Sequence, residues 1–229
     1  AVNAAYGAYL ATNRPQAVMV HSTIGTLNGL AGLMNAQRMR IPMIFLAGRT
    51  PVTEVGSNAS RDLFVHWAQE SYDQASAVRE YVKWDYELRD PSMLFDVVQR
   101  AYSIAMEEPR GPVYISLPRE LLLREATHNH LSLLATQTQS SYLSADDQDI
   151  NKVLEMLRHS KKPLMLTKTA GAEVRGFQAL EDFLNFIPIP IVAINEHYCN
   201  LRFDHPCLLK TDFDRYFKEA DLIINLDMD

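Results

Sequence analysis

The chain has 229 residues, with 22 lysines and arginines against 28 aspartates and glutamates, which gives a formal net charge of −6. Hydrophobic residues make up 47% and charged residues 22%, a composition that supports a buried core and excludes a wholly disordered chain. No apolar run is long enough to span a membrane, and no basic cluster suits nucleic acid. The two cysteines, Cys199 and Cys207, are too few for a disulfide framework, so we expect a cytoplasmic protein.

The first half of the chain alternates between helical and strand patterns. Apolar residues recur at helical spacing in some segments and form short continuous runs in others. This alternation predicts an α/β domain with a parallel sheet and right-handed crossovers. The predicted helices cover 1–12, 27–40 and 91–106, and the predicted strands cover 17–20, 42–47 and 113–117.

The same alternation restarts after a polar tract that begins near Thr136. We therefore predict a first domain over 1–127, a linker over 128–148 and the first part of a second α/β domain over 149–229. In this second domain the predicted helices cover 149–160 and 176–186, and the predicted strands cover 163–167, 189–194 and 222–226.

Both ends of the sequence interrupt a pattern. The helical spacing is already under way at Ala1, and the strand at 222–226 is followed by only a few residues. We therefore expect an internal fragment of a longer protein.

The polar segment 22–28 is the first candidate for a binding site. It follows a buried strand and precedes a helix, which is where open α/β sheets bind their ligands. It lacks the glycine patterns of dinucleotide and P-loop sites, and a plain connection fits its residues equally well. Ser22 has only the neighbouring His21 as a base, so a hydrolase triad has weak support.

Other chemistry-bearing residues give weaker signals. The seven histidines show no metal-binding spacing, so we predict no metal site in this chain. The carboxylates between Asp62 and Glu87 are interpreted mostly as a solvated surface.

Several segments, taken in order, resemble the pyrimidine-binding domain of thiamine diphosphate enzymes, and their spacing resembles the acetolactate synthase-like branch. These segments are 4–12, 22–30, 41–51, Gln69-Glu70, Lys83 and 111–118. The resemblance continues into that family's central domain at 162–166, 171–172, 190–192, 204–206 and 220–223. It implies a three-layer pyrimidine-binding domain lacking its start, followed by a Rossmann-like central domain lacking its end.

The resemblance also implies an activity for the parent protein. Thiamine diphosphate and Mg²⁺ would serve decarboxylation of a pyruvate-type 2-oxo acid and transfer of the acyl carbanion equivalent, as in branched-chain amino acid biosynthesis. A cofactor shared by two chains implies a homodimer or homotetramer. The catalytic glutamate would fall just before Ala1 and the metal site beyond Asp229, so we expect the chain alone to be inactive.

Individual site residues follow from the same resemblance. Gly25 and Asn28 match the turn that lines the cofactor pyrimidine, and Thr23-Ile24 replaces the Gly-Pro that usually precedes this glycine. Gln69 matches a glutamine facing the substrate, and Lys83 matches a lysine of the synthase branch. FAD remains open as a further cofactor, although 167–171 lacks the glycine-rich form of its segment.

Two other functions remain open on the sequence. A non-catalytic dimerisation or regulatory module could keep this fold and lose the chemistry, and the Thr23-Ile24 departure slightly favours it. A nicotinamide-dependent oxidoreductase would explain the α/β order but not the missing glycine fingerprint.

Overall fold

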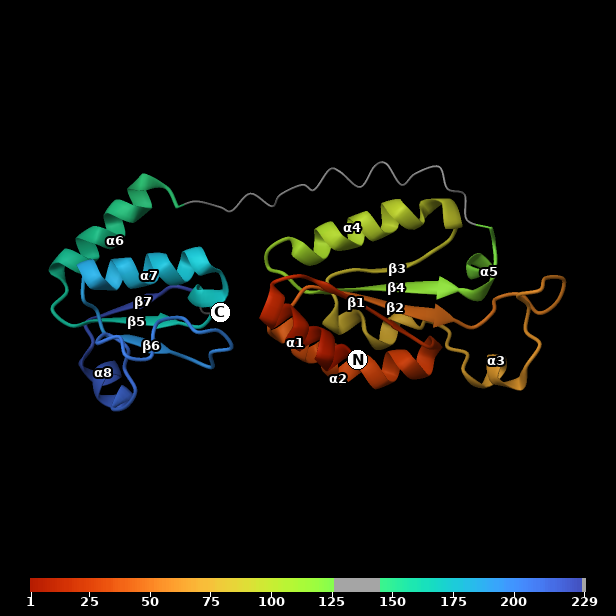
Figure 1. Ribbon diagram of the computed structural model, residues 1–229, viewed down its shortest axis with the longest axis horizontal. Helices are drawn as coiled ribbons and strands as arrows, with labels where there is room; N and C mark the ends of the chain where they lie inside the picture. The colour runs from red at the N-terminus through yellow and green to blue at the C-terminus, as the bar shows by residue number, and fades with distance from the viewer. Residues whose placement is uncertain (126–144, 228–229) are drawn as a thin grey trace. The chain divides into compact units, whose positions relative to one another are not determined.

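The computed structural model describes residues 1–125 and 145–227, which belong to two compact units divided between Ser141 and Tyr142 (Figure 1). We call 1–125 the first unit and 145–227 the second unit. The predicted linker over 128–148 lies outside the described residues except for its last four, and a helix already begins at Asp147. None of the helices within the described ranges has the length and apolar character needed to cross a membrane.

The first unit is built on a four-stranded sheet in the order β1-β2-β4-β3. All three strand pairs are parallel, which confirms the α/β class. The central pair aligns Met43 with Pro112 and Arg49 with Pro118, so both strands end at the same edge. The strands are β1 (Gln16–Val20), β2 (Met43–Arg49), β3 (Asp85–Glu87) and β4 (Pro112–Pro118).

Helices cover both faces of this sheet and make three layers. Figure 1 shows α1 and α2 on one face and α4 on the other. Phe45 and Tyr114 are fully buried in the core on the side of α1 and α2, whereas Ile115 is buried in the core on the side of α4. The helices are α1 (Val2–Thr12), α2 (Ser22–Arg38), α3 (Phe64–Ala68), α4 (Leu94–Met106) and α5 (Arg119–Leu122), with 3₁₀ turns η1 (Ala75–Ala77), η2 (Arg79–Tyr81) and η3 (Pro91–Met93).

Helix α2 begins five residues earlier than its apolar spacing predicts. The supposed turn at 22–26 is its first helical turn, and the buried positions there are the polar residues Ser22 and Thr26. An apolar period could not reveal a helix start that packs polar groups inward. The helix can begin directly at the strand end because Gly25 lies against Val20, where an added Cβ would come within 2.7 Å of the Val20 Cβ.

Strand β3 has no counterpart in the sequence prediction. It is only three residues long, carries Asp85 and Glu87, and pairs at one edge of the sheet with β4. Such a short charged segment has too few residues for an alternating pattern to stand out.

The second unit contains a three-stranded parallel sheet in the order β6-β5-β7. The predicted strand over 163–167 is confirmed at both ends, and the predicted strand over 189–194 is shorter than expected. Met165, Leu180 and Leu184 join β5 to α7 in the core. The elements are α6 (Asp147–His159), β5 (Pro163–Thr167), η5 (Ala170–Ala172), α7 (Val174–Phe186), β6 (Ile191–Ala193), α8 (Phe213–Glu219) and β7 (Leu222–Asn225), of which α8 was not predicted.

Asp221 ties the start of β7 to the segment that leads into β5. Its carboxylate accepts hydrogen bonds from the Ser160 hydroxyl at 2.5 Å and from the backbone N–H of Lys161 at 2.8 Å and of Lys162 at 3.0 Å. These bonds, the Ser160 hydroxyl foremost, lower the pKa of Asp221 from 3.8 to about 2. Only the ionised form accepts all three bonds.

We predict that Asp221 stabilises the second unit above pH 3.8 and that this contribution is lost as the pH falls towards 2, because the folded pKa is depressed. Asp221→Asn should lower the urea midpoint followed by circular dichroism at neutral pH, and the difference from the natural chain should shrink on acidification. Asp214→Asn, an exposed position on α8, is the control. A difference that stays constant across the titration would contradict the assignment.

Candidate active site

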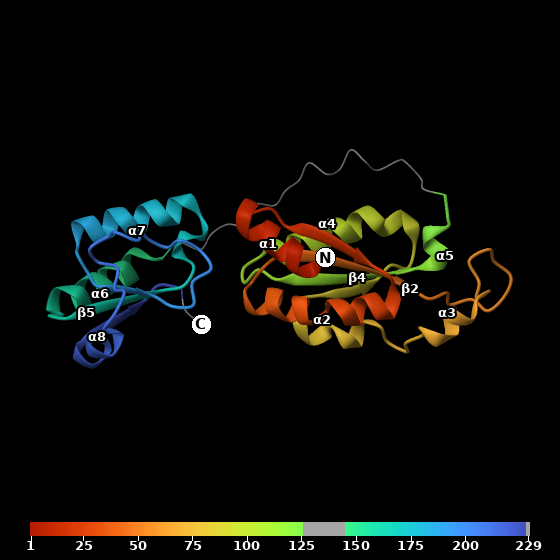
Figure 2. The ribbon, with the colours of Figure 1, turned by 60° about the horizontal axis from the view of Figure 1, so that its bottom comes forward.

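The carboxyl ends of β1, β2 and β4 lie at the same end of the first unit's sheet, near α3 and α5 (Figures 1 and 2). We call this carboxyl-terminal end the edge of the sheet, as distinct from its lateral edge at β3. This edge receives the start of α2, the end of β2 and part of the long connection between β2 and β3. Parallel α/β sheets bind ligands at this edge because loops there can present side chains without disturbing the sheet.

Two of the predicted site residues, Thr23 and Gln69, lie together at the start of α2. The Thr23 hydroxyl donates to the Gln69 carbonyl oxygen at 2.9 Å, and the Ser22 hydroxyl donates to the Gln69 side-chain oxygen at 2.7 Å. Ser22 Oγ is also 3.2 Å from Nδ1 of His21. Thr23 and Ser22 are 46 and 47 residues away from Gln69 in the sequence. Only the fold brings these three residues together.

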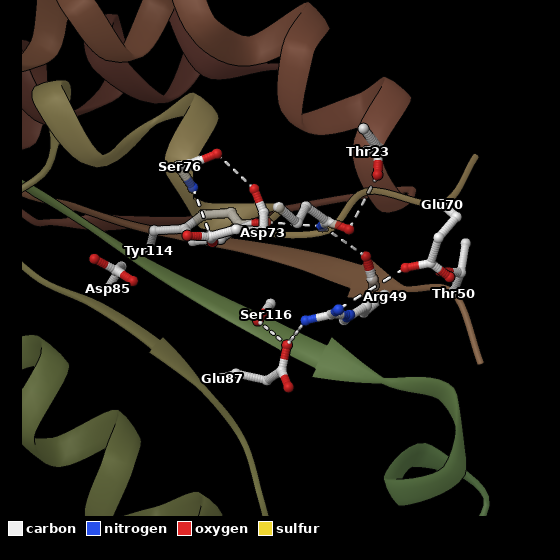
Figure 3. A network of polar contacts seen from close by, with 12 residues as sticks. Thr23, Arg49, Thr50, Glu70, Asp73, Ser76, Asp85, Glu87, Tyr114 and Ser116 are labelled. Atoms are coloured by element: carbon white, nitrogen blue, oxygen red, sulfur yellow. Dashed lines mark hydrogen bonds and ion pairs between the residues drawn. The ribbon is translucent and has the colours of Figure 1, made fainter. Parts of the chain in front are cut away.

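Gln74 anchors this group to the sheet from the inside. Its side chain is only 3% exposed, and its amide nitrogen donates to the Gly48 carbonyl at 3.0 Å and to the Tyr114 hydroxyl at 2.8 Å. Its amide oxygen accepts from the Thr23 hydroxyl at 3.2 Å. Burial raises the pKa of Tyr114, so the phenol stays neutral as a partner. Figure 3 shows this network running from Thr23 across β2 and β4.

A cluster of ion pairs lies at the same end of the sheet, between the ends of β2 and β3 and the connection that joins them. Arg49 pairs with Glu87, and Arg61 pairs with Glu70. Glu70 also accepts from the Thr50 hydroxyl at 2.9 Å, and its other oxygen lies 3.8 Å from Arg49 (Figure 3). The expectation that the carboxylates between Asp62 and Glu87 are mostly a solvated surface is wrong for Glu70 and Glu87, because the fold places them against two largely buried guanidinium groups.

Of the other residues predicted around the pyrimidine, Ile24 and Asn28 lie on the exposed side of α2, whereas Gly25 faces Val20. Ile24 is 50% exposed, Asn28 is also exposed, and Gly25 donates its N–H to the His21 carbonyl at 2.7 Å. Leu27 is 47% exposed beside them. The first turn of α2 therefore presents apolar side chains next to N–H groups that have no acceptor within the helix.

Lys83 lies elsewhere. Its backbone N–H donates to Pro112, at the amino end of β4, whereas Gln69 contacts the start of α2 beyond the carboxyl end of β1. Its ammonium donates to the carbonyls of Ile104 at 2.5 Å and Glu107 at 2.6 Å, which places a cation at the C-terminus of α4. Burial lowers the pKa of Lys83, although the nearby carboxylates of Glu107 and Glu108 oppose this. The fold thus does not bring Lys83 to the predicted site.

Sequence reasoning left out several residues of this edge. Arg49 and Thr50 come at the end of a predicted strand, so the rule that ligands bind at carboxyl ends could have identified them. Gln74 and Glu87 carry no comparable signal, because they meet the others only through long-range contacts. Within 1–125 and 145–227, no group of three histidine, cysteine or acidic side chains is placed to hold a metal ion.

Comparison with known proteins shows which enzymes have sequences similar to this chain. Residues 1–77 match the family described as "Thiamine pyrophosphate enzyme, N-terminal TPP binding domain". The chain is 26% identical over 220 residues to the acetolactate synthase large subunit of Lactococcus lactis, covering 91% of this chain and 36% of that protein. These matches assign residues 1–77 to the N-terminal domain of the thiamine diphosphate-dependent enzyme family, and the similarity to such enzymes extends over most of the chain.

Other members of the family are about as similar. Identity is 24% over 218 residues with 2-hydroxyacyl-CoA lyase 1 of Dictyostelium discoideum, covering 94% of this chain and 36% of that protein. Identity is 29% over 181 residues with benzoylformate decarboxylase of Pseudomonas aeruginosa, covering 78% of this chain and 31% of that protein. The chain spans about a third of the length of these relatives.

The fold is also that of a solved family structure. A 4-hydroxybenzoylformate decarboxylase of Rhodococcus jostii RHA1 matches with a TM-score of 0.80 at 22% identity, over 98% of this chain and 42% of that one. The order of strands and helices in both units is therefore the order found in thiamine diphosphate enzymes.

We predict that Gln74→Ala destabilises the first unit by about 2–4 kcal/mol, because it leaves the buried Gly48 carbonyl and Tyr114 hydroxyl without this partner. Urea unfolding followed by tryptophan fluorescence reports on this unit, since both Trp67 and Trp84 lie in it. The exposed amide variant Asn35→Ala on α2 should change stability by less than about 0.5 kcal/mol. Equal midpoints for the two variants would show that the network contributes nothing.

Proposed function

We propose that this chain forms the pyrimidine side of the cofactor site in a thiamine diphosphate-dependent enzyme that decarboxylates a 2-oxo acid and transfers the resulting acyl group, as acetolactate synthases do. The observation that carries the proposal is the start of α2, over its first two turns, where the fold joins Thr23 to Gln69 and leaves Ile24, Leu27 and Asn28 exposed. The match of residues 1–77 to the family supports it.

The chemistry of this turn fits an aminopyrimidine ring. Ile24 and Leu27 offer apolar surface to the ring faces, while the side-chain amide of Asn28 and the free N–H groups of the helix start offer hydrogen bonds to its edge. Gly25 keeps the helix start close to β1, which sets where such a ring would lie. Bound thiamine diphosphate would supply the carbon that adds to the substrate carbonyl and accepts the electron pair released with CO₂.

The chain's own residues would orient the reactants. Gln69 would present its amide N–H groups to the 2-oxo acid, because Ser22 holds its side-chain oxygen and Thr23 holds its backbone carbonyl. We do not assign the Mg²⁺ of the cofactor to this chain, because its described residues offer no cluster of suitable ligands. Lys83 is proposed to stabilise the end of α4.

A second subunit would cover the open edge. Large hydrophobic side chains around α3 are strongly exposed, among them Val55 at 85%, Phe64 at 84%, Trp67 at 46% and Tyr72 at 104%. Exposed apolar side chains gathered in one segment favour a protein partner, here a second copy in a homodimer or homotetramer. A reducing compartment such as the cytoplasm suits the two free cysteines.

The proposal can be tested on the protein at its native length, loaded with thiamine diphosphate and Mg²⁺. Release of CO₂ from a panel of 2-oxo acids, with and without a second oxo acid as acceptor, separates decarboxylation from ligation. We expect cofactor-dependent turnover, and we expect none from the 229-residue chain assayed alone. Binding of neither thiamine diphosphate nor substrate would favour a non-catalytic module, and NAD-dependent turnover would favour an oxidoreductase.

In the same assay we predict that Gln69→Ala lowers kcat/KM by about tenfold or more, which corresponds to about 1.4 kcal/mol of transition-state stabilisation. The reason is that its amide would contact the substrate. Asn35→Ala, an exposed position on α2, should leave kcat/KM unchanged. If the Gln69 variant matches this control while thiamine diphosphate still binds, the role given to Gln69 is wrong and the cofactor assignment stands.

A further inference from the structure

The turn after β5 in the second unit is the place where a Rossmann-like fold would hold the diphosphate of a dinucleotide. It follows a central parallel strand and leads through η5 into α7. In this chain the turn contains Gly171 and is followed in α7 by Gly176, so its glycine content alone leaves the site open.

A carboxylate of the chain itself occupies this turn. Asp227, which follows β7, accepts the backbone N–H of Lys168 at 2.7 Å and the backbone N–H of Thr169. The same carboxylate accepts the Thr169 hydroxyl at 2.9 Å and the Thr167 hydroxyl at 3.3 Å. Two adjacent N–H groups and two hydroxyls around one anion are the donor set that a phosphate would use.

The other backbone N–H groups of the turn are also hydrogen-bonded within the chain. The Gly171 N–H donates to the side-chain oxygen of Asn200 at 2.9 Å, and Asn200 is completely buried. The Ala170 N–H donates to the Thr167 hydroxyl at 3.4 Å, and the Ala172 N–H donates to the Thr169 carbonyl at 2.8 Å. All five backbone donors from 168 to 172 therefore already have acceptors within the chain.

The glycines here serve contacts within the protein. A Cβ on Gly171 would collide with the Cys199 carbonyl oxygen, and a Cβ on Gly176 would collide with the Ala170 carbonyl oxygen. Their missing side chains make room for backbone of the same chain, so these glycines are explained without a bound diphosphate. Glu173 at the N-cap of α7 adds a second negative charge to this segment, which also carries the cations Lys168 and Arg175.

We infer that the Asp227 carboxylate takes the place that the phosphate of a dinucleotide would occupy in the second unit. This turn therefore binds neither FAD nor a nicotinamide dinucleotide. The FAD left open by the family resemblance does not fit these residues. The second unit is then a structural domain whose turn is held by a carboxylate in place of a phosphate. This inference uses only contacts within the second unit and does not depend on the proposed function.

The direct test is equilibrium dialysis of the 229-residue chain against FAD and, separately, against ADP. We expect no retained flavin and a Kd weaker than about 1 mM for either ligand. Retention of FAD with a Kd below about 100 µM, competed by ADP, would overturn the inference.

A pair of variants tests the role of Asp227 itself. Asp227→Ala frees the Lys168 and Thr169 amides, so sulfate should raise its Tm by about 3 °C or more relative to NaCl at equal ionic strength. Asp214→Ala removes an exposed carboxylate from α8 and should show no such response. A folded Asp227→Ala that responds like Asp214→Ala would overturn the assignment, and if this variant does not fold, the dialysis decides.

Discussion

The buried amide of Gln74 holds the candidate site together. It is the group that links β2 through Gly48, β4 through Tyr114 and α2 through Thr23. An amide suits this position because it donates and accepts at the same point. A carboxylate could not donate to the Gly48 carbonyl, and an apolar side chain would remove a partner from Gly48, Tyr114 and Thr23. The position of the first turn of α2, and with it the open surface at Ile24 and Asn28, depends on this link.

Charge at the same edge is balanced locally. Each of the two largely buried guanidinium groups, Arg49 and Arg61, faces a carboxylate, and Glu70 contacts both of them. Pairing of this kind fixes side-chain positions more than it stabilises the fold, because removing the charges from water offsets much of their attraction. The result is a preorganised polar edge beside exposed apolar side chains, a combination suited to an uncharged heterocyclic ring.

The two units use the same strand-to-helix turn in opposite ways. In the first unit the turn into α2 leaves its outer face open, with Ile24 and Leu27 about half exposed. In the second unit the turn into α7 is filled by Asp227 and Asn200. Since both turns follow parallel strands and contain glycine, the difference comes from what the rest of each unit places over them. One fold class thus supports a candidate binding surface in one unit and a closed turn in the other.

The amino-acid sequence by itself determined the α/β class, the place of nearly every long helix and central strand, and the family resemblance. These features rest on apolar periodicity and on ordered local motifs, both of which act over short stretches of chain. The tertiary structure decided which polar residues meet. Gln69 joins Ser22, Lys83 goes to the end of α4, and Asp227 fills a turn about 60 residues away. These pairings depend on how the strands stack side by side, and a local pattern carries no information about such long-range contacts.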